Sequence, residues 1–190
     1  MVKLSRAEVE YFRPIAEAQE SRRNYFRGAS DFRRGLTDSP TLRGMIGEHT
    51  FCKWINGKFP ELRLEVDVSD KPRGDGGIDL MLFGVTIQVK TRSQHLRGVC
   101  LIRRQNDAGD IMPLPWHLMV SVTIPREIAV GGFLPTTIDG FIFKDDLPTD
   151  SLRDARRGNH MNLEVPDTAL SSVGELFDYL EGRKNATRPS

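Results

Sequence analysis

The residues best suited to chemistry stand near the middle of the chain, where Asp79 precedes Gln88 and Lys90 follows Gln88 by two positions. A Phe83-Gly84 dipeptide lies halfway between Asp79 and Gln88 and suits the two-residue turn of a β-hairpin. With that turn, Asp79 lies directly across from Gln88, at the roughly 5 Å that separates the Cβ atoms of opposed residues. The spacing therefore predicts that Asp79, Gln88 and Lys90 converge on one polar patch.

The opposite face of this predicted hairpin is wholly aliphatic. A shift of one residue would turn every side chain to the other face, so the aliphatic pairs define the register. These pairs are Leu82 with Val85, Leu80 with Ile87 and Ile78 with Val89. The register that buries the aliphatic residues is also the one that gathers the polar ones.

A carboxylate next to an amide oxygen suits a hard divalent cation such as Mg²⁺ or Mn²⁺. A neighbouring lysine adds positive charge or a proton relay beside a metal-bound water, which is the equipment of metal-assisted phosphodiester hydrolysis. The alternative is a cross-strand salt bridge between Asp79 and Lys90 on a solvated sheet face. That alternative accounts neither for the glycines just before Asp79 nor for a glutamine at position 88.

An upstream helix over residues 42–55 is predicted from an apolar stripe at helical spacing. Glu48 falls inside this stripe, and burial of an unpaired carboxylate is so costly that a cation, a metal or a hydrogen-bond partner is expected. The alternative is that Glu48 lies at the edge of the stripe, where it reaches water or pairs with Lys53. The stripe itself consists of Leu42, Met45, Cys52 and Ile55.

The order of these residues resembles the PD-(D/E)xK nuclease superfamily. Glu48 follows a glycine on the predicted helix, the run Asp75-Gly-Gly-Ile-Asp79 comes next, and Gln88-Val-Lys90 completes the motif. The chain is most similar to the Mrr-type and Holliday-junction-resolvase-like branches, which use a QxK ending. The resemblance spans about residues 44–92 and implies an α/β fold, with a restriction-endonuclease-like core in which helices flank a mixed central β-sheet.

The resemblance also implies a role for each residue of the motif. Asp79 would ligate the metal, and Gln88 would occupy the place of the second acidic ligand through its side-chain oxygen. The backbone carbonyl of Val89 would add a ligand, Lys90 would position or activate the attacking water, and Glu48 would orient metal-bound water. Gln88 departs from the acidic pattern, and because a neutral amide binds Mg²⁺ less strongly than a carboxylate, one metal is favoured over two.

The remaining elements would position this site. A first helix is predicted near the N-terminus from apolar residues at helical spacing. A last helix is predicted over residues 171–180, with Ser171 or Ser172 as N-cap, Glu175 completing a capping box with Ser172, and Gly182 as the stop. Strands are predicted over residues 62–68, 78–83, 85–89, 118–124 and 141–143.

Basic residues are concentrated at the N-terminus, where residues 1–43 carry nine Lys and Arg against six Asp and Glu, a net charge of +3. This excess predicts a surface that contacts the phosphates of a nucleic acid. The alternative is an ordinary solvated helix face whose arginines pair with Glu17 and Glu20. The predicted contacts are Arg22, Arg23, Arg27, Arg33 and Arg34, with Arg92 near the hairpin as a further one.

A chain of 190 residues and 21.5 kDa suits one core with appendages. The predicted divisions are an arginine-rich helical extension over residues 1–43, a nuclease-like α/β domain over 44–182 and a flexible tail over 183–190. A net charge of +1 excludes a whole-molecule field that attracts polyanions. No apolar run approaches a membrane helix or a signal peptide, and the two cysteines lack zinc-ligand spacing, so a cytoplasmic protein is expected.

The expected function is a Mg²⁺-dependent deoxyribonuclease, most simply an endonuclease, whose partner is DNA. The resemblance also implies a possible homodimer, because members of the family that cut both strands of a duplex symmetrically are related by a two-fold axis. The alternative is a nucleic-acid-binding or protein-binding module that keeps the fold with little or no cleavage. An enzyme acting on a small phosphorylated substrate is disfavoured, because no glycine-rich phosphate loop opens a helix.

Overall fold

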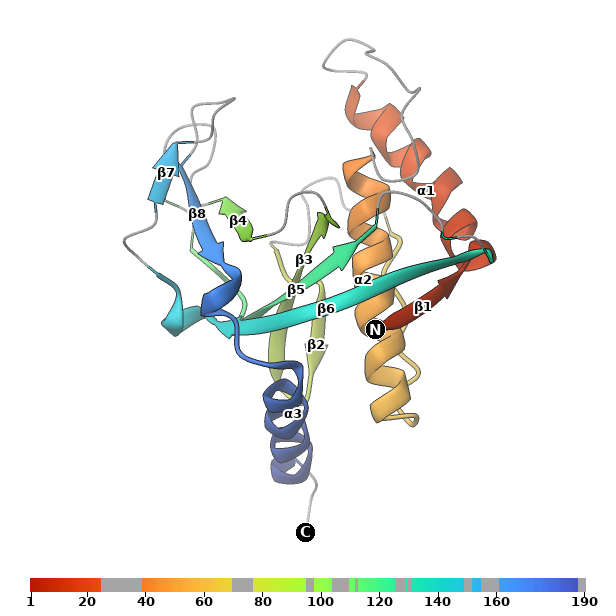
Figure 1. Ribbon diagram of the computed structural model, residues 1–190. Helices are drawn as coiled ribbons and strands as arrows, with labels where there is room; N and C mark the ends of the chain where they lie inside the picture. The colour runs from red at the N-terminus through yellow and green to blue at the C-terminus, as the bar shows by residue number, and fades with distance from the viewer. Residues whose placement is uncertain are drawn as a thin grey trace. The chain divides into compact units, whose positions relative to one another are not determined.

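The computed structural model describes residues 1–24, 39–69, 77–94, 98–103, 110–111, 113–125, 129, 131–148, 152–154 and 161–187 (Figure 1). The chain divides into two compact units. The first comprises Met1–Gly74, Val89–His95 and Val122–Ile138, and the second comprises Asp75–Gln88, Leu96–Ser121 and Asp139–Ser190.

The fold is α/β, as predicted, and its larger sheet is mixed. That sheet has the order β1-β6-β5-β3-β2, formed by Val2–Ser5, Phe133–Phe143, Leu118–Ile124, Val85–Ser93 and Leu80–Leu82. A second sheet has the order β4-β8-β7, formed by Val99–Arg103, Met161–Pro166 and Leu152–Asp154. The helices are α1 (Arg6–Asn24), α2 (Pro40–Lys58) and α3 (Val173–Thr187), with short 3₁₀ turns at Lys144–Asp146 and Asp167–Ala169. In the part of the chain described, no helix is long and apolar enough to cross a membrane.

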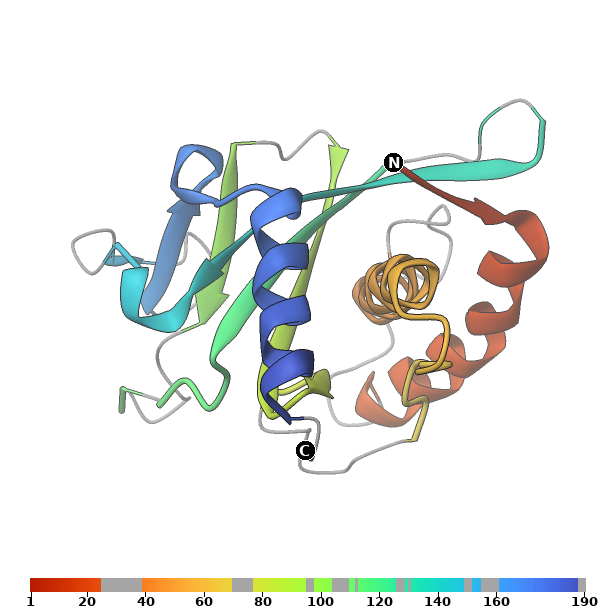
Figure 2. The same cartoon turned by 90° about the horizontal axis from the view of Figure 1, so that it is seen from below.

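In the first unit, the N-terminus is held by both a strand and a helix. Strand β1 pairs antiparallel with β6, from Val2 opposite Thr136 to Ser5 opposite Phe133. Helix α1 follows at once and lies beside α2, as Figure 2 shows from below. Residues 1–24 are therefore built into the same unit as α2, and the boundary predicted at residue 43 falls inside that helix.

A capping box begins α1. The Ser5 amide donates to Glu8 Oε2 at 2.6 Å, and the Glu8 amide donates to Ser5 Oγ at 3.2 Å. Each residue thus satisfies a backbone N–H group that the first turn of a helix leaves without an intrahelical partner.

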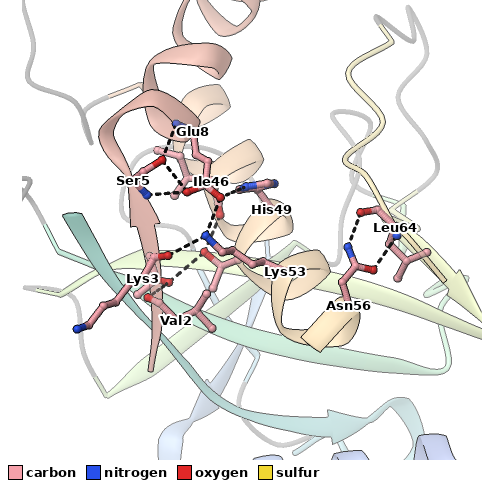
Figure 3. A network of polar contacts seen from close by, with 11 residues as sticks. Val2, Lys3, Ser5, Glu8, Ile46, His49, Lys53, Asn56 and Leu64 are labelled. Atoms are coloured by element: carbon pink, nitrogen blue, oxygen red, sulfur yellow. Dashed lines mark hydrogen bonds and ion pairs between the residues drawn. The ribbon is translucent and has the colours of Figure 1, made fainter. Parts of the chain in front are cut away.

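Glu8 also joins α1 to α2. Its Oε1 atom accepts a hydrogen bond from Lys53 Nζ at 2.7 Å and lies 3.2 Å from His49 Nε2, while Lys53 Nζ donates to the Lys3 carbonyl at 2.9 Å (Figure 3). Burial acts to raise the pKa of Glu8, but the hydrogen bonds from Lys53, Ser5 and His49 outweigh it and lower this pKa to about 2. One carboxylate therefore connects β1, α1 and α2.

Helix α2 confirms the apolar stripe expected of residues 42–55, since all four members are buried. Its first turn is set by Ser39, whose side chain accepts from the Leu42 amide at 3.0 Å, and by Pro40 at the first helical position. This proline needs no N–H partner there, which is why the helix begins before the predicted start.

The strand predicted over residues 62–68 is wrong, because no residue of this segment belongs to a strand. Asn56 replaces a strand partner: its Nδ2 donates to the Leu64 carbonyl at 2.9 Å, and its Oδ1 accepts from the Leu64 amide at 2.7 Å (Figure 3). Gln19 Nε2 likewise donates to the Val68 carbonyl at 3.2 Å. The alternating pattern reflects an extended chain with one side half-buried, which sequence alone does not distinguish from a strand.

In the second unit, the sheet β4-β8-β7 encloses a core that the sequence patterns did not predict. Cys100 and Ile102 of β4 and Leu163 and Val165 of β8 point inward. They pack with Trp116, Met119, Ile142 and Leu147. Strands β4 and β8 are short and far apart in the sequence, so only tertiary pairing brings them together, whereas β7 directly precedes β8.

Helix α3 confirms the predicted capping box, since the Ser172 amide donates to Glu175 Oε2 at 2.7 Å and the Glu175 amide donates to Ser172 Oγ at 3.3 Å. The predicted stop at Gly182 is wrong, because the helix continues to Thr187. A mid-helix glycine costs only about 1 kcal/mol. Residues 183–187 therefore belong to the helix and are not a tail. Arg183, in the additional turn, lies close to the hairpin turn: its Nη2 atom would be 3.6 Å from a Cβ atom added to Gly84.

Replacing Glu8 by Gln is expected to lower the free energy of unfolding at pH 7 by about 1 to 2 kcal/mol, because charged hydrogen bonds are lost. The pKa of Glu8 is lower in the folded than in the unfolded protein, so its contribution is complete above about pH 5 and is lost as the pH falls toward 2. Denaturant unfolding at a series of pH values measures both effects. Glu175→Gln, in the exposed capping box of α3, is the matched control, and equal losses in the two variants would contradict the role given to Glu8.

Candidate active site

Over residues 80–82 and 85–87 the central hairpin has the predicted register. Leu80 pairs with Ile87, Met81 with Thr86, and Leu82 with Val85. Both turn residues have positive φ, 49° for Phe83 and 77° for Gly84, as the type of two-residue turn that matches the twist of a hairpin requires. The Asp79 amide donates to the Ile87 carbonyl at 2.9 Å, although Ile87 already pairs with Leu80, so the backbone just before β2 is offset by one residue from the predicted register. The predicted pair of Ile78 with Val89 is not among the strand pairs, and Ile78 packs instead against the core of the second unit.

Asp79 and Gln88 meet on one side of this hairpin. Gln88 Nε2 donates to Asp79 Oδ2 at 2.5 Å. Gln88 is only 7% exposed, and Asp79 is half-buried. The predicted juxtaposition of a carboxylate and an amide is therefore confirmed.

Gly77 explains part of the glycine run before Asp79. Its φ is +85°, and an added Cβ would lie 3.0 Å from Gln88 Oε1. A glycine there accepts the left-handed backbone and lets the chain pass close to the Gln88 amide. The amide oxygen of Gln88 therefore faces the Gly77 backbone while its NH₂ group faces Asp79; Asp75 lies outside the described residues.

Lys90 extends from the same side of β3 as Gln88, because alternate residues of a strand share a side. Its side chain is half-buried. Among the residues described, the Lys90 side chain makes no hydrogen bond or ion pair. The salt bridge with Asp79 that would give this lysine a purely structural role is therefore not formed.

Helix α2 approaches β3 from the other side of the strand. An added Cβ at Gly47 would overlap the Thr91 side chain, and Arg43 Nη1 donates to Ser93 Oγ at 3.2 Å. Thr91 and Ser93 alternate with Val89, on the aliphatic side of the strand. The contact of the helix therefore lies opposite the side that carries Gln88 and Lys90.

Glu48 is half-buried on this helix. Lys53, its expected alternative partner, is bonded to Glu8 and to the Lys3 carbonyl. Asp79 and Gln88 therefore meet in the second unit, and Glu48 lies on α2 of the first unit.

The predicted phosphate-contacting arginines have different surroundings. Arg92 is 6% exposed, and its Nε donates to Thr123 Oγ1 at 3.0 Å, so it is part of the sheet interior rather than an open surface. Arg22 is exposed near the end of α1. The side chain of Arg23, together with Arg27, Arg33 and Arg34, lies outside the described residues.

Sequence reasoning missed His117, which lies beside Thr86 in the second unit. The Thr86 amide donates to His117 Nδ1 at 3.1 Å, Thr86 Oγ1 lies 2.6 Å from the same nitrogen, and the His117 amide donates to the Thr86 carbonyl at 2.9 Å. Thr86 belongs to the polar side of the hairpin, two residues before Gln88. Nothing in the sequence indicates that the residue before β5 pairs with this position.

A carboxylate at Asp79 and an amide at Gln88 fit a hard divalent cation in type, but here the NH₂ group of Gln88, and not its oxygen, faces Asp79. In the described part of the chain, no three His, Cys, Asp or Glu side chains gather into a metal-binding group.

No family model, curated protein or solved structure matches this chain. The resemblance to nucleases therefore remains a prediction from the motif residues.

Gly47→Ala is expected to lower the free energy of unfolding by about 1 to 3 kcal/mol, because the new methyl group overlaps Thr91 and forces α2 away from β3. Gly57→Ala, on the same helix with nothing within 4 Å, should instead gain up to about 1 kcal/mol from helix propensity. Thermal and denaturant unfolding check the two signs. Stabilisation by both substitutions would refute the close contact.

Gly77→Ala is expected to destabilise the protein by about 1 to 2 kcal/mol through its positive φ and to displace the Gln88 amide. Gly98 also has a positive φ, +105°, but no atom lies within 4 Å of an added Cβ. Gly98→Ala should therefore destabilise the protein through backbone strain without moving the Gln88 amide. The side-chain NH₂ resonances of Gln88 distinguish the two variants by NMR. If both substitutions leave those resonances unmoved, Gly77 does not position the amide.

Proposed function

We propose that this protein is a metal-dependent nuclease that hydrolyses phosphodiester bonds of DNA with an activated water. The observation that carries the proposal is a half-buried lysine without a partner among the described residues, on the same side of β3 as a hydrogen-bonded carboxylate–amide pair. That arrangement combines an anion-attracting group with oxygen ligands for a cation.

The charge of Lys90 supports an anionic substrate. A charged side chain that is partly removed from water usually has a compensating partner. A phosphate supplies that partner with two or more acceptor oxygens, and a charge-assisted hydrogen bond to it is stronger than one between neutral groups. Lys90 would hold a phosphate oxygen or the attacking water and stabilise the charge that develops during hydrolysis.

Asp79 and the amide of Gln88 would hold Mg²⁺ or Mn²⁺, with the Val89 carbonyl as a further ligand. A bound divalent ion supplies a Lewis acid and lowers the pKa of its water. Asp79 would give the metal site its one negative charge from this pair. Gln88 is neutral and would add no further negative charge near the phosphate. The water-orienting role predicted for Glu48, which is half-buried on α2, stays a prediction.

The competing function is a module that binds nucleic acid without cleaving it.

The number of subunits in solution determines how the protein could cut a duplex. A homodimer would present two such sites to the two strands. Size-exclusion chromatography with light scattering, with and without a DNA duplex, measures this directly.

Asp79→Ala and Lys90→Ala are each expected to reduce cleavage of DNA by about 100-fold or more in the presence of Mg²⁺, because each removes a group that acts on the reacting phosphate or water. Gln88→Glu should keep cleavage and preserve or tighten Mg²⁺ binding, since it adds a charged oxygen ligand. Cleavage is measured on supercoiled, linear, single-stranded and branched DNA and on RNA, with Mg²⁺, Mn²⁺ or EDTA.

The matched controls are Asp178→Ala and Lys58→Ala, which remove the same charges from exposed positions on α3 and α2. Circular dichroism verifies that each variant is folded. Full cleavage by both site variants would eliminate the proposed site. A wild-type protein that binds nucleic acid but cuts no substrate would favour the binding module.

A further inference from the structure

Strands β3 and β5 are neighbours with a constant offset. The Thr86 amide contacts His117 Nδ1, and Arg92 Nε contacts Thr123 Oγ1, and in both pairs the partners are 31 positions apart. A constant difference in residue number means that the strands run parallel. His117 therefore holds a defined register position beside Thr86.

The His117 ring lies on the polar side of the hairpin. It contacts the Thr86 side chain, and Thr86 and Gln88 are alternate residues of β3. His117, directly before β5, lies beside Thr86, and Thr86 is two residues before Gln88. Two residues of a strand span roughly 7 Å, so His117 lies about that far along the sheet from the Asp79–Gln88 pair. Met81, which is 69% exposed, lies opposite Thr86 in the same row.

The hydrogen bonds fix which nitrogen of His117 can donate. A backbone N–H group only donates, so Nδ1 must accept from the Thr86 amide, and the proton of the neutral ring is on Nε2. The residue is exposed, and among the described residues Nε2 has no hydrogen-bond partner. The fold therefore presents an oriented N–H donor to solvent beside the candidate site.

We propose that His117 Nε2 donates to a phosphate next to the one cleaved, so that the substrate is a polynucleotide strand and not an isolated phosphodiester. This inference rests on the nuclease function proposed above. The offset of His117 from the Asp79–Gln88 pair is of the size of one nucleotide step along an extended strand. The exposed Met81 side chain in the same row provides an apolar surface for the sugar between the two phosphates.

Two substitutions separate the Nε2 donor from the contact with Thr86. His117→Asn places an amide oxygen near the position of Nδ1 and so retains an acceptor for the Thr86 amide, but it lacks the Nε2 donor. His117→Gln is longer and places an amide NH₂ near the position of Nε2. His117→Asn should lower kcat/KM on an oligonucleotide about 10-fold, the loss of one hydrogen bond to a charged group, and His117→Gln should restore most of it.

The substrate provides the decisive comparison. With bis(p-nitrophenyl) phosphate, which has a single phosphate, His117→Asn should match the wild type, whereas Asp79→Ala should lose activity on both substrates. A single methylphosphonate, placed in turn at each linkage flanking the cleaved bond, removes one phosphate charge. At one linkage it should weaken the wild type about 10-fold and leave His117→Asn unchanged.

Equal sensitivity of the wild type and His117→Asn to every methylphosphonate would overturn the assignment, as would wild-type kcat/KM of His117→Asn on the oligonucleotide. Equal losses on the oligonucleotide and on the small diester would also reject it, since His117 would then act on the cleaved phosphate or on the fold. If the wild type cleaves oligonucleotides but not the small diester, the methylphosphonate series decides alone. A wild type that cleaves neither substrate refutes the nuclease function itself.

Discussion

A two-residue turn at Phe83 and Gly84 holds β2 and β3 in one register, and the candidate site takes its geometry from that register. The turn has positive φ at both positions, which matches the twist of the flanking strands. A slip of one residue would expose the aliphatic side and bury the polar one. This register places Gln88 on the side of β3 opposite the aliphatic residues, where its side-chain amide bonds Asp79 just before β2.

Two glycines allow other segments to approach this hairpin closely. Gly77 lets the chain pass against the Gln88 amide, and Gly47 lets α2 pack directly on Thr91. The helix contacts the side of β3 that carries Thr91 and Ser93, and Lys90 lies on the opposite side of the strand.

The first unit relies on a polar connection as well as on burial. Glu8 caps α1, pairs with Lys53 and His49 of α2, and shares Lys53 with the Lys3 carbonyl of β1. Its lowered pKa reflects this set of donors. The sequence suggests that the basic N-terminal segment is an appendage. Glu8 instead bonds this segment to α2 within the first unit, and the net charge of the segment gives no sign of this contact.

Local patterns in the sequence were sufficient for the hairpin and its register, the apolar stripe of α2, the capping box of α3 and the position of β5, because each depends on neighbours along the chain or on strict alternation. Tertiary structure decided the rest. It replaced a predicted strand at residues 62–68 by side-chain bonds from Asn56 and Gln19, extended α3 past Gly182, and paired β4 with β8. It also placed Arg92 in the interior and His117 beside Thr86. These outcomes depend on contacts between residues distant in sequence, whose free energies no local pattern contains.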